Sequence, residues 1–246
     1  MDLKRKISAE LENDGNPEKK LKILENVIAS FGCRQGEREE MQDYHVLTRK
    51  FDLGKGFLHR CSFFAIFDGH AGSRAARFCQ QKMEHEIRQK LEKYETLGDM
   101  QKSMKMVFVE AFRKVDEEFC GKAKTEKPVW KDGTTATTML LLNETLYVAN
   151  IGDTRAIVAR RKSAAAASAS ASASPQQLTA IPLTIDHSPM LHAERMRIQA
   201  QGGCVKDGRV NGVIEVSRSI GDLGLKSAGL TSLPDLKKLT LTKDDL

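Results

Sequence analysis

The chain alternates between short apolar runs and longer stretches in which apolar residues recur at helical spacing. Residues 60–67 form a run that is short, apolar and β-prone, and that therefore predicts a buried strand. After residues 68–72 the spacing becomes helical in two successive stretches. Their apolar stripes are Ala75, Cys79, Met83, Ile87 and Leu91, and then Met104, Phe108, Ala111, Val115 and Phe119. This pattern predicts a strand followed by two long helices that each bury one face.

The next part of the chain favours β-structure. Residues 134–142, 145–151 and 155–160 are predicted strands, and only a few residues separate each from the next. Such short connections require antiparallel pairing, because a parallel crossover needs about a dozen residues. Residues 181–185 can rejoin the same sheet, and residues 190–201 predict a short helix. We therefore expect an α+β protein in which an antiparallel sheet is packed by helices.

Two segments of biased composition lie outside this pattern. Residues 1–28 are charged and contain Asn-Asp-Gly-Asn-Pro, so we expect a basic, flexible N-terminal arm before a domain at 29–246. Within residues 163–177 alanine and serine alternate, and their small side chains predict an inserted surface loop. No run of about 18 apolar residues that would span a bilayer is present, so we expect no membrane association.

Composition limits the classes of partner. With 39 Lys and Arg against 33 Asp and Glu, the formal net charge is +6, and 40% of residues are hydrophobic, which excludes a wholly disordered chain. Basic clusters at 4–6 and 19–22 fit either a bipartite nuclear-import signal or a solvated arm, and both interpretations remain open. The aromatic content of 6% and the lack of a stacking motif indicate no nucleic-acid partner. Five widely spaced cysteines without an export signal favour reduced thiols, and we expect a nuclear or cytoplasmic location, or both.

The strongest chemical signal follows the strand predicted at 60–67. The Asp68 carboxylate and the Gly69 carbonyl offer two oxygen ligands for a hard cation such as Mg²⁺ or Mn²⁺, and His70 can exchange a proton near neutral pH. The alternative is a turn in which Asp68 caps the following helix. Asp43, in a charged segment, and Asp153, in a turn between two strands, could join Asp68 in a metal site or be ordinary solvated carboxylates.

Five motifs carry a family resemblance. They are Arg-Glu-Glu-Met-Gln-Asp at 38–43, Phe-Asp-Gly-His-Ala-Gly at 67–72, Asp-Gly-Thr-Thr-Ala at 132–136, Ala-Asn-Ile-Gly-Asp-Thr-Arg-Ala at 149–156 and Val-Ser-Arg-Ser-Ile-Gly-Asp at 216–222. In identity and order they resemble the type-2C metal-dependent protein serine/threonine phosphatase family, from about residue 29 onward. The resemblance implies a sandwich of two antiparallel sheets flanked by helices, phosphoprotein substrates, a kinase complex as candidate partner, and a monomer.

The resemblance also implies a metal centre with two Mg²⁺ or Mn²⁺ ions at one end of the sandwich. Asp68 would bridge both ions, and the Gly69 carbonyl would bind one of them. Asp43 would act through metal-bound waters, and Asp153 matches a carboxylate that serves a weaker third ion. Gln42 stands where many members have Glu, and this departure weakens any ligand role for it.

For catalysis, the resemblance implies attack on phosphoserine or phosphothreonine by a hydroxide that bridges the two metal ions. Arg38 matches the arginine that binds the phosphate, for which a planar guanidinium is well suited. His70 is the candidate general acid for the departing serine or threonine oxygen. No covalent phosphoenzyme is required.

The chain departs from the family pattern at its C-terminal end. Members carry two further metal-binding aspartates, in an Asp-Gly and an Asp-Asn motif, beyond the position matched by Leu246. We therefore expect a fold that is incomplete at its C-terminus and weaker cation binding, because fewer carboxylates would neutralise the ions. The alternative function is a catalytically weak or inactive truncated form that acts as a phosphoprotein- or kinase-interacting module.

Overall fold

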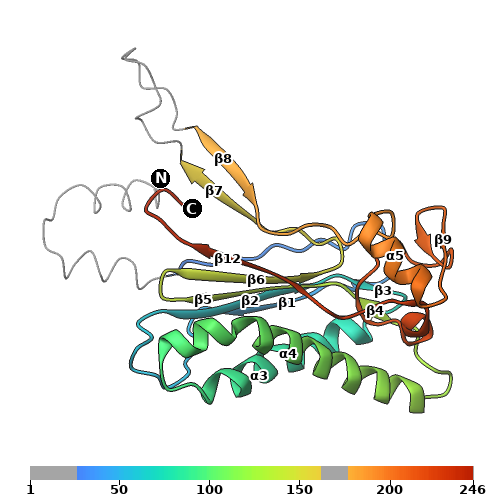
Figure 1. Ribbon diagram of the computed structural model, residues 1–246, viewed down its shortest axis with the longest axis horizontal. Coiled ribbons are helices and arrows are strands. Elements are labelled where there is room, and N and C mark those ends of the chain that lie inside the picture. Colours follow the sequence, from blue (N-terminus) through green and yellow to red (C-terminus); the bar gives the residue numbers. More distant parts are fainter. Residues whose placement is uncertain (1–26, 162–176, 246) are drawn as a thin grey trace, which may run out of the picture. The chain divides into compact units, whose positions relative to one another are not determined.

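The computed structural model describes residues 27–161 and 177–245 (Figure 1). The predicted basic arm lies outside the described residues except for residues 27 and 28, and the predicted Ala/Ser loop does so except for Gln177. The chain divides into two units, residues 1–30 and 31–246. All the helices and strands named below belong to the second unit.

A five-stranded antiparallel sheet forms the centre of this unit, in the order β1-β2-β5-β6-β12. The strands are β1 (Tyr44–Thr48), β2 (Cys61–Phe67), β5 (Ala136–Leu142), β6 (Thr145–Ile151) and β12 (Asp235–Thr240). A two-residue turn at Asn143-Glu144 joins β5 to β6, and Asn143 has a positive φ of 52°. The asparagine suits this turn because it tolerates the left-handed conformation. The strands predicted at 60–67, 134–142 and 145–151 and their antiparallel pairing are confirmed. The strand predicted at 155–160 also forms, but its expected pairing with 145–151 is wrong, because β12 occupies that edge of β6.

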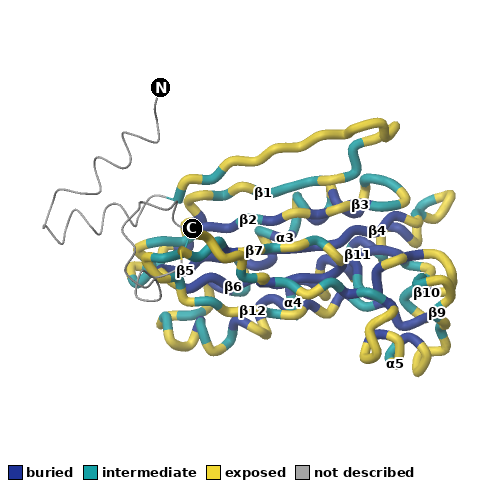
Figure 2. The backbone as a smooth tube through the Cα atoms, turned by 90° about the horizontal axis from the view of Figure 1, so that it is seen from above, coloured by how far each residue is buried: buried dark blue, intermediate teal, exposed yellow. Residues whose placement is uncertain are grey.

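Two long helices cover one face of this sheet (Figure 1). They are α3 (Arg74–Glu92) and α4 (Leu97–Thr125), and both predicted stripes are buried. Phe63 and Phe67 of β2 are fully buried in the same core as the helices. Burial of each such large side chain contributes about 1.5–3 kcal/mol. Figure 2 shows how buried positions concentrate along the inner strands of the sheet. No helix within the described ranges is both long and apolar enough to cross a membrane.

A ribbon of two strands lies on the other side of the central sheet (Figure 1). It consists of β7 (Ile157–Arg161) and β8 (Leu178–Pro182). The prediction that residues 181–185 rejoin the main sheet is therefore wrong, because β12 occupies the outer edge of β6 and β8 pairs with β7. The fold class, antiparallel sheets packed by helices, is confirmed.

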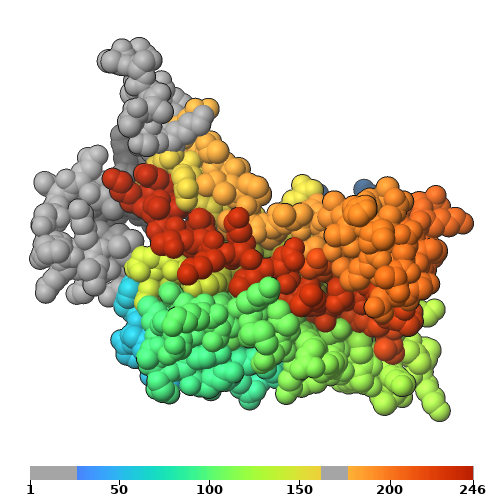
Figure 3. Space-filling view, in the orientation of Figure 1, coloured from blue at the N-terminus to red at the C-terminus, as the bar shows by residue number. Residues whose placement is uncertain are grey.

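Small elements gather at one end of the central sheet. A three-stranded sheet contains β3 (Gly69–His70), β4 (Gly133–Thr134) and β11 (Ile220–Gly221), in the order β11-β4-β3. Nearby are α5 (His192–Ala200), the pair β9 (Val205–Lys206) and β10 (Arg209–Val210), and the 3₁₀ helix η2 (Leu223–Ala228). The α5 region has its own apolar cluster around Ile198, Val210 and Leu230. Figure 3 shows this region, in orange, as a distinct lobe at one end of the visible face.

Candidate active site

The ends of β2 and β6 meet around one buried threonine. Thr135 donates its backbone N–H to the carbonyl of Asp68 at 2.9 Å, and its hydroxyl accepts the Asp68 N–H at 3.2 Å. The same hydroxyl lies 2.7 Å from that of Thr154. Thr134 adds a further hydrogen bond to the Asp68 carbonyl at 3.0 Å. The backbone at Asp68 is therefore fixed, and the turn that carries Asp153 is tied to it.

Three aspartates, Asp43, Asp68 and Asp153, lie at the ends of β1, β2 and β6. Tyr44 pairs with Phe67, so Asp43 and Asp68 lie at adjoining ends of β1 and β2. Partial desolvation raises the pKa of Asp68, and so do the negative charges of Asp43 and Asp153 and a hydrogen bond with Asp43. Burial is the largest cause of the shift, and the two neighbouring negative charges, which a cation would offset, add to it.

The donor set fits a hard divalent cation in its chemistry. Carboxylate and carbonyl oxygens are the ligands that Mg²⁺ and Mn²⁺ prefer. A side chain at Gly69 would overlap the carbonyl oxygen of Gln42, so the glycine allows the segment before Asp43 to approach closely. In the part of the chain that the structure describes, however, no three His, Cys, Asp or Glu side chains are arranged closely enough to hold a metal ion. The ligand roles of Asp43, Asp68, Gly69 and Asp153 stay predictions.

Arg38 lies in an irregular segment before β1 and is exposed. Its carbonyl accepts a hydrogen bond from the Gln35 side chain at 2.7 Å, and two residues later Glu40 accepts one from the Ser73 hydroxyl at 2.5 Å. The first bond holds the backbone carbonyl of Arg38, and the second links the side chain of Glu40 to the start of α3. Across residues 27–161 and 177–245, the guanidinium has no carboxylate partner, so it remains able to bind an anion.

His70 is paired with an aspartate that is distant in sequence. Its Nε2 lies 2.8 Å from Oδ2 of Asp222, which also accepts the Ser219 hydroxyl at 2.6 Å. Burial lowers the pKa of His70, but the hydrogen bond to Asp222 and the negative charges of Asp222, Asp68 and Asp153 outweigh this effect and raise it above the ordinary value. The ring is therefore held beside the carboxylates.

The helix-cap interpretation of Asp68 is wrong. The N–H of Arg74, the first residue of α3, donates instead to Oδ1 of Asp132 at 3.1 Å. The Arg74 side chain bonds the same buried carboxylate twice, at 2.8 and 2.7 Å. A side chain at Gly72 would overlap Asp132, so the glycine makes room for this contact.

Sequence reasoning assigned no role to either Asp132 or Asp222. Both belong to motifs that served only to indicate the family, at 132–136 and 216–222. A usable signal was present in each motif, since each aspartate lies beside a glycine and must find a partner if it is buried. The identity of that partner depends on the tertiary fold.

Comparison with known proteins decides the family. Residues 29–246 match the family model described as protein phosphatase 2C. The chain belongs to the protein phosphatase 2C family. The motifs at Arg38, Asp68, Asp132, Asp153 and Asp222 are therefore those of a protein phosphatase 2C domain, as the sequence predicted.

Curated relatives agree with this assignment. The rat integrin-linked kinase-associated serine/threonine phosphatase 2C is 40% identical over 98% of this chain and 62% of its own length. The bovine protein of the same name is 42% identical over 98% of this chain and 65% of its own length. A probable protein phosphatase 2C 67 of rice is 37% identical over 91% of this chain and 60% of its own length. The chain thus spans somewhat less than two thirds of these relatives.

Solved structures support the fold. The serine-threonine phosphatase 2C of Toxoplasma gondii superposes with a TM-score of 0.69 at 19% identity, covering 85% of this chain and 72% of the other. A sex determining protein of C. elegans superposes with a TM-score of 0.62 at 21% identity, covering 85% of this chain and 47% of the other. At such identities the likeness shows a shared protein phosphatase 2C architecture and nothing about activity.

Proposed function

We propose that this chain hydrolyses phosphoserine and phosphothreonine in proteins, with Mg²⁺ or Mn²⁺ as cofactor. One arrangement supports the proposal. Burial and the negative charges of Asp43 and Asp153 raise the pKa of Asp68, and the nearby His70 ring is hydrogen-bonded to Asp222. The family assignment gives this arrangement a reaction class. Bound divalent cations would supply a nucleophile from water near neutral pH and offset negative charge on the phosphate oxygens.

The residues of the chain have separate tasks in this reaction. Asp43, Asp68, Asp153 and the Gly69 carbonyl hold the cations. The exposed guanidinium of Arg38 binds two phosphate oxygens at once and orients the phosphate, since its planar fork matches them. His70 gives a proton to the departing serine or threonine oxygen, a contribution of about 10²- to 10⁴-fold to the rate.

The test is phosphopeptide hydrolysis by the purified chain with and without Mn²⁺. We expect Mn²⁺-dependent turnover that Asp68→Asn abolishes, because this variant removes a charge from the centre of the carboxylate group. Glu144→Gln is the control, since Glu144 lies in the turn between β5 and β6 at the other end of the hairpin from Asp153. Turnover no higher than that of the metal-free blank would overturn the proposal. Phosphopeptide binding without turnover would instead favour the phosphoprotein- or kinase-interacting module.

We further propose a kinase complex as a partner. Support comes from the names of the rat and bovine relatives, which associate those proteins with integrin-linked kinase. A binding measurement between the purified chain and integrin-linked kinase tests this, with the Asp68→Asn variant included to trap a bound phosphoprotein. Absence of binding by both the wild-type chain and the variant would contradict it.

A further inference from the structure

Asp222 is a buried carboxylate with two hydrogen-bond donors and an unusual backbone. It is 7% exposed, and its Oδ2 accepts from Ser219 at 2.6 Å and lies 2.8 Å from Nε2 of His70. Its φ of 50° lies in the left-handed region, which is uncommon for residues other than glycine. Its N–H donates to the carbonyl of Asp132 at 2.9 Å, which helps to hold this conformation.

A second group of contacts supports the loop that carries Asp222. The buried Asp116 on α4 accepts the Gly221 N–H at 2.8 Å and pairs with Lys226 at 2.8 Å. Lys226 also donates to the carbonyl of Ser219 at 3.0 Å. Asp116 of α4 and the carbonyl of Asp132, just before β4, thus hold the backbone at Gly221 and Asp222. This support keeps the Asp222 carboxylate in place as an acceptor for the histidine.

Gly133 leaves the space in which the pair meets. A side chain at this position would overlap both Oδ2 of Asp222 and Nε2 of His70. The two side chains therefore pack directly over the β4 backbone, and little freedom is left to the imidazole ring. The His70 side chain retains 29% exposure, so solvent or a ligand can still reach part of the ring.

Because an ionised carboxylate only accepts hydrogen bonds, Nε2 of His70 carries a hydrogen and donates a hydrogen bond to Asp222. Its other ring nitrogen, Nδ1, has no hydrogen-bond partner among the described residues. The hydrogen bond made by one ring nitrogen determines the role that the other nitrogen can take. The pairing with Asp222 thus makes Nδ1 the atom that can face a ligand.

We propose that Asp222 is a positioning residue that fixes the His70 ring so that Nδ1, and not Nε2, delivers the proton to the leaving group. The inference rests on the proposed phosphatase function and adds to it the atom that transfers the proton and the residue that selects it. In the step, the ring carries a proton on both nitrogens: a water oxygen bonds to phosphorus, the bond from phosphorus to the serine or threonine oxygen breaks, that oxygen takes the proton from Nδ1, and the Nε2 proton stays in the hydrogen bond with Asp222. Asp222 itself does not touch the substrate.

The proposal predicts a dependence on the leaving group. A serine or threonine alkoxide is a strongly basic leaving group and needs protonation, whereas p-nitrophenolate leaves readily without it. Loss of His70 positioning should therefore affect a phosphothreonine peptide and spare p-nitrophenyl phosphate. A general loss of folding or of cation binding would reduce both activities alike.

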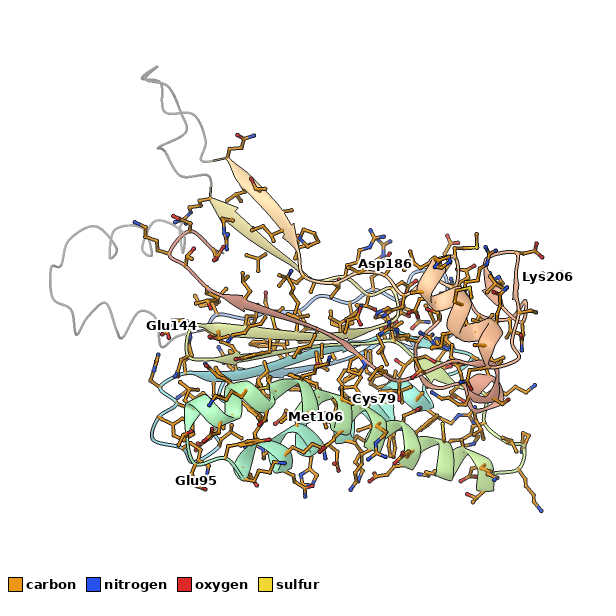
Figure 4. The ribbon with its side chains drawn as sticks, viewed as in Figure 1. Cys79, Glu95, Met106, Glu144, Asp186 and Lys206 are labelled. Carbon is orange, nitrogen blue, oxygen red and sulfur yellow. The ribbon has the colours of Figure 1, made fainter. Side chains whose placement is uncertain are left out.

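The decisive variant is Asp222→Asn, which keeps the shape but can donate as well as accept at Nε2. With Mn²⁺ present, we expect kcat for the phosphopeptide to fall about 10- to 100-fold more than kcat for p-nitrophenyl phosphate, within the range of a general acid. Ser219→Ala removes the other donor to the carboxylate and should give a smaller change of the same kind. Glu144→Gln makes the same carboxylate-to-amide change in the His59–Glu144 pair. Figure 4 shows Glu144 at one end of the sheet and Asp186, in the segment just before His187, towards the other end. It should change neither rate.

A spectroscopic test needs no turnover. In the metal-free chain labelled with ¹⁵N-histidine, the wild type should show an Nε2–H signal of His70 protected from water exchange, assigned by its loss in His70→Gln. Asp222→Asn should lose this protection, and Glu144→Gln should keep it. Equal losses on both substrates, or an Nε2–H signal that Asp222→Asn leaves unchanged, would overturn the positioning role. A wild type without turnover would overturn the proposed function, while the Nε2–H spectrum would still decide the positioning role.

Discussion

Two histidine–aspartate pairs within residues 27–161 and 177–245 look alike and have opposite surroundings. In one, Nε2 of His70 lies 2.8 Å from Asp222, and in the other, Nε2 of His187 lies 3.1 Å from Asp235. In the first pair the aspartate is buried and the histidine side chain is 29% exposed. In the second pair the aspartate side chain is 57% exposed and the histidine only 2%.

The second ring nitrogen accounts for the difference. Nδ1 of His187 accepts the N–H of Gly152 at 3.2 Å, so protonation would destroy that hydrogen bond. Burial and the positive charge of Arg218 lower the pKa of His187, against the influence of Asp235. His70 has its pKa raised and leaves Nδ1 open. A histidine–aspartate pair therefore joins two segments of the fold at His187, whereas at His70 it leaves one ring nitrogen without a partner among the described residues.

The structural pair also reaches the candidate active site. His187 and Gly152 exchange two hydrogen bonds, since the N–H of His187 donates to the Gly152 carbonyl at 2.9 Å. Gly152 directly precedes Asp153, and its φ of 91° favours glycine. The comparison thus separates a histidine that we propose acts on substrate from one that holds the backbone next to a candidate ligand.

The largest expected effect comes from exchanging each histidine for glutamine. His70→Gln should lower kcat for a phosphopeptide by about 10²- to 10⁴-fold, because the general acid is lost. Its melting temperature should fall as well, since the buried Asp222 carboxylate loses one of its two side-chain partners, but this loss is far smaller than the loss of rate. His187→Gln should cost about 1–3 kcal/mol of folding free energy by leaving the buried N–H of Gly152 without its acceptor, with little effect on kcat. Rates and thermal unfolding of the two variants check this, and similar profiles for both would contradict the comparison.

A second prediction concerns the support of the His187 pair. Glu194 is 4% exposed and accepts hydrogen bonds from Ser217, Arg197 and Arg218, and Arg218 also pairs with Asp235. Glu194→Gln should destabilise the fold by about 3–5 kcal/mol, the usual result of breaking a buried ion pair from one side. Urea unfolding measures the loss. Glu117→Gln, in an exposed pair with Arg113, is the matched control and should change stability by less than about 1 kcal/mol.

The same cluster predicts sensitivity to acid. Burial opposes ionisation of Glu194, but hydrogen bonds from Arg218 and Ser217 lower its pKa to about 2 from the ordinary value of 4.5. A carboxylate with a lowered pKa stabilises the fold above its unfolded pKa, and this contribution is lost as the pH falls from about 4.5 towards 2. The shift corresponds to about 3 kcal/mol. Urea unfolding across this range should show the loss in the wild type and a shallower dependence in Glu194→Gln; equal slopes would contradict it.

Much of the fold was predictable because its signals are local. The stripes of α3 and α4 repeat over many residues, and the turn at Asn143-Glu144 separates two obvious strands. Strands of two residues, such as β3, β4 and β11, carry no periodicity and were not predicted. The pairing of β8 depended on which strand had already taken the edge of β6, and the sequence alone could not resolve that competition.

The candidate site was predictable only in part for the same reason. Asp68 and His70 directly follow the strand β2, so the local sequence motif alone predicts a site there. Asp222 is 152 residues away from His70, and only the fold of β3, β4 and β11 into one small sheet brings the two together. The contact of His187 with Gly152 likewise joins two loops that share no sequence pattern.

The smallest expected effect belongs to a third pair, His59–Glu144, which lies at the surface. Its atoms are 2.9 Å apart, a distance similar to those of the buried pairs, but the side chains are 43% and 50% exposed. Water solvates both groups and screens their attraction, so Glu144→Gln should change the free energy of unfolding by less than about 0.5 kcal/mol. Thermal unfolding and phosphopeptide turnover should both match the wild type. A large effect on either would mean that distance alone governs these pairs; a null result would show that burial and the second ring nitrogen set the role of each histidine.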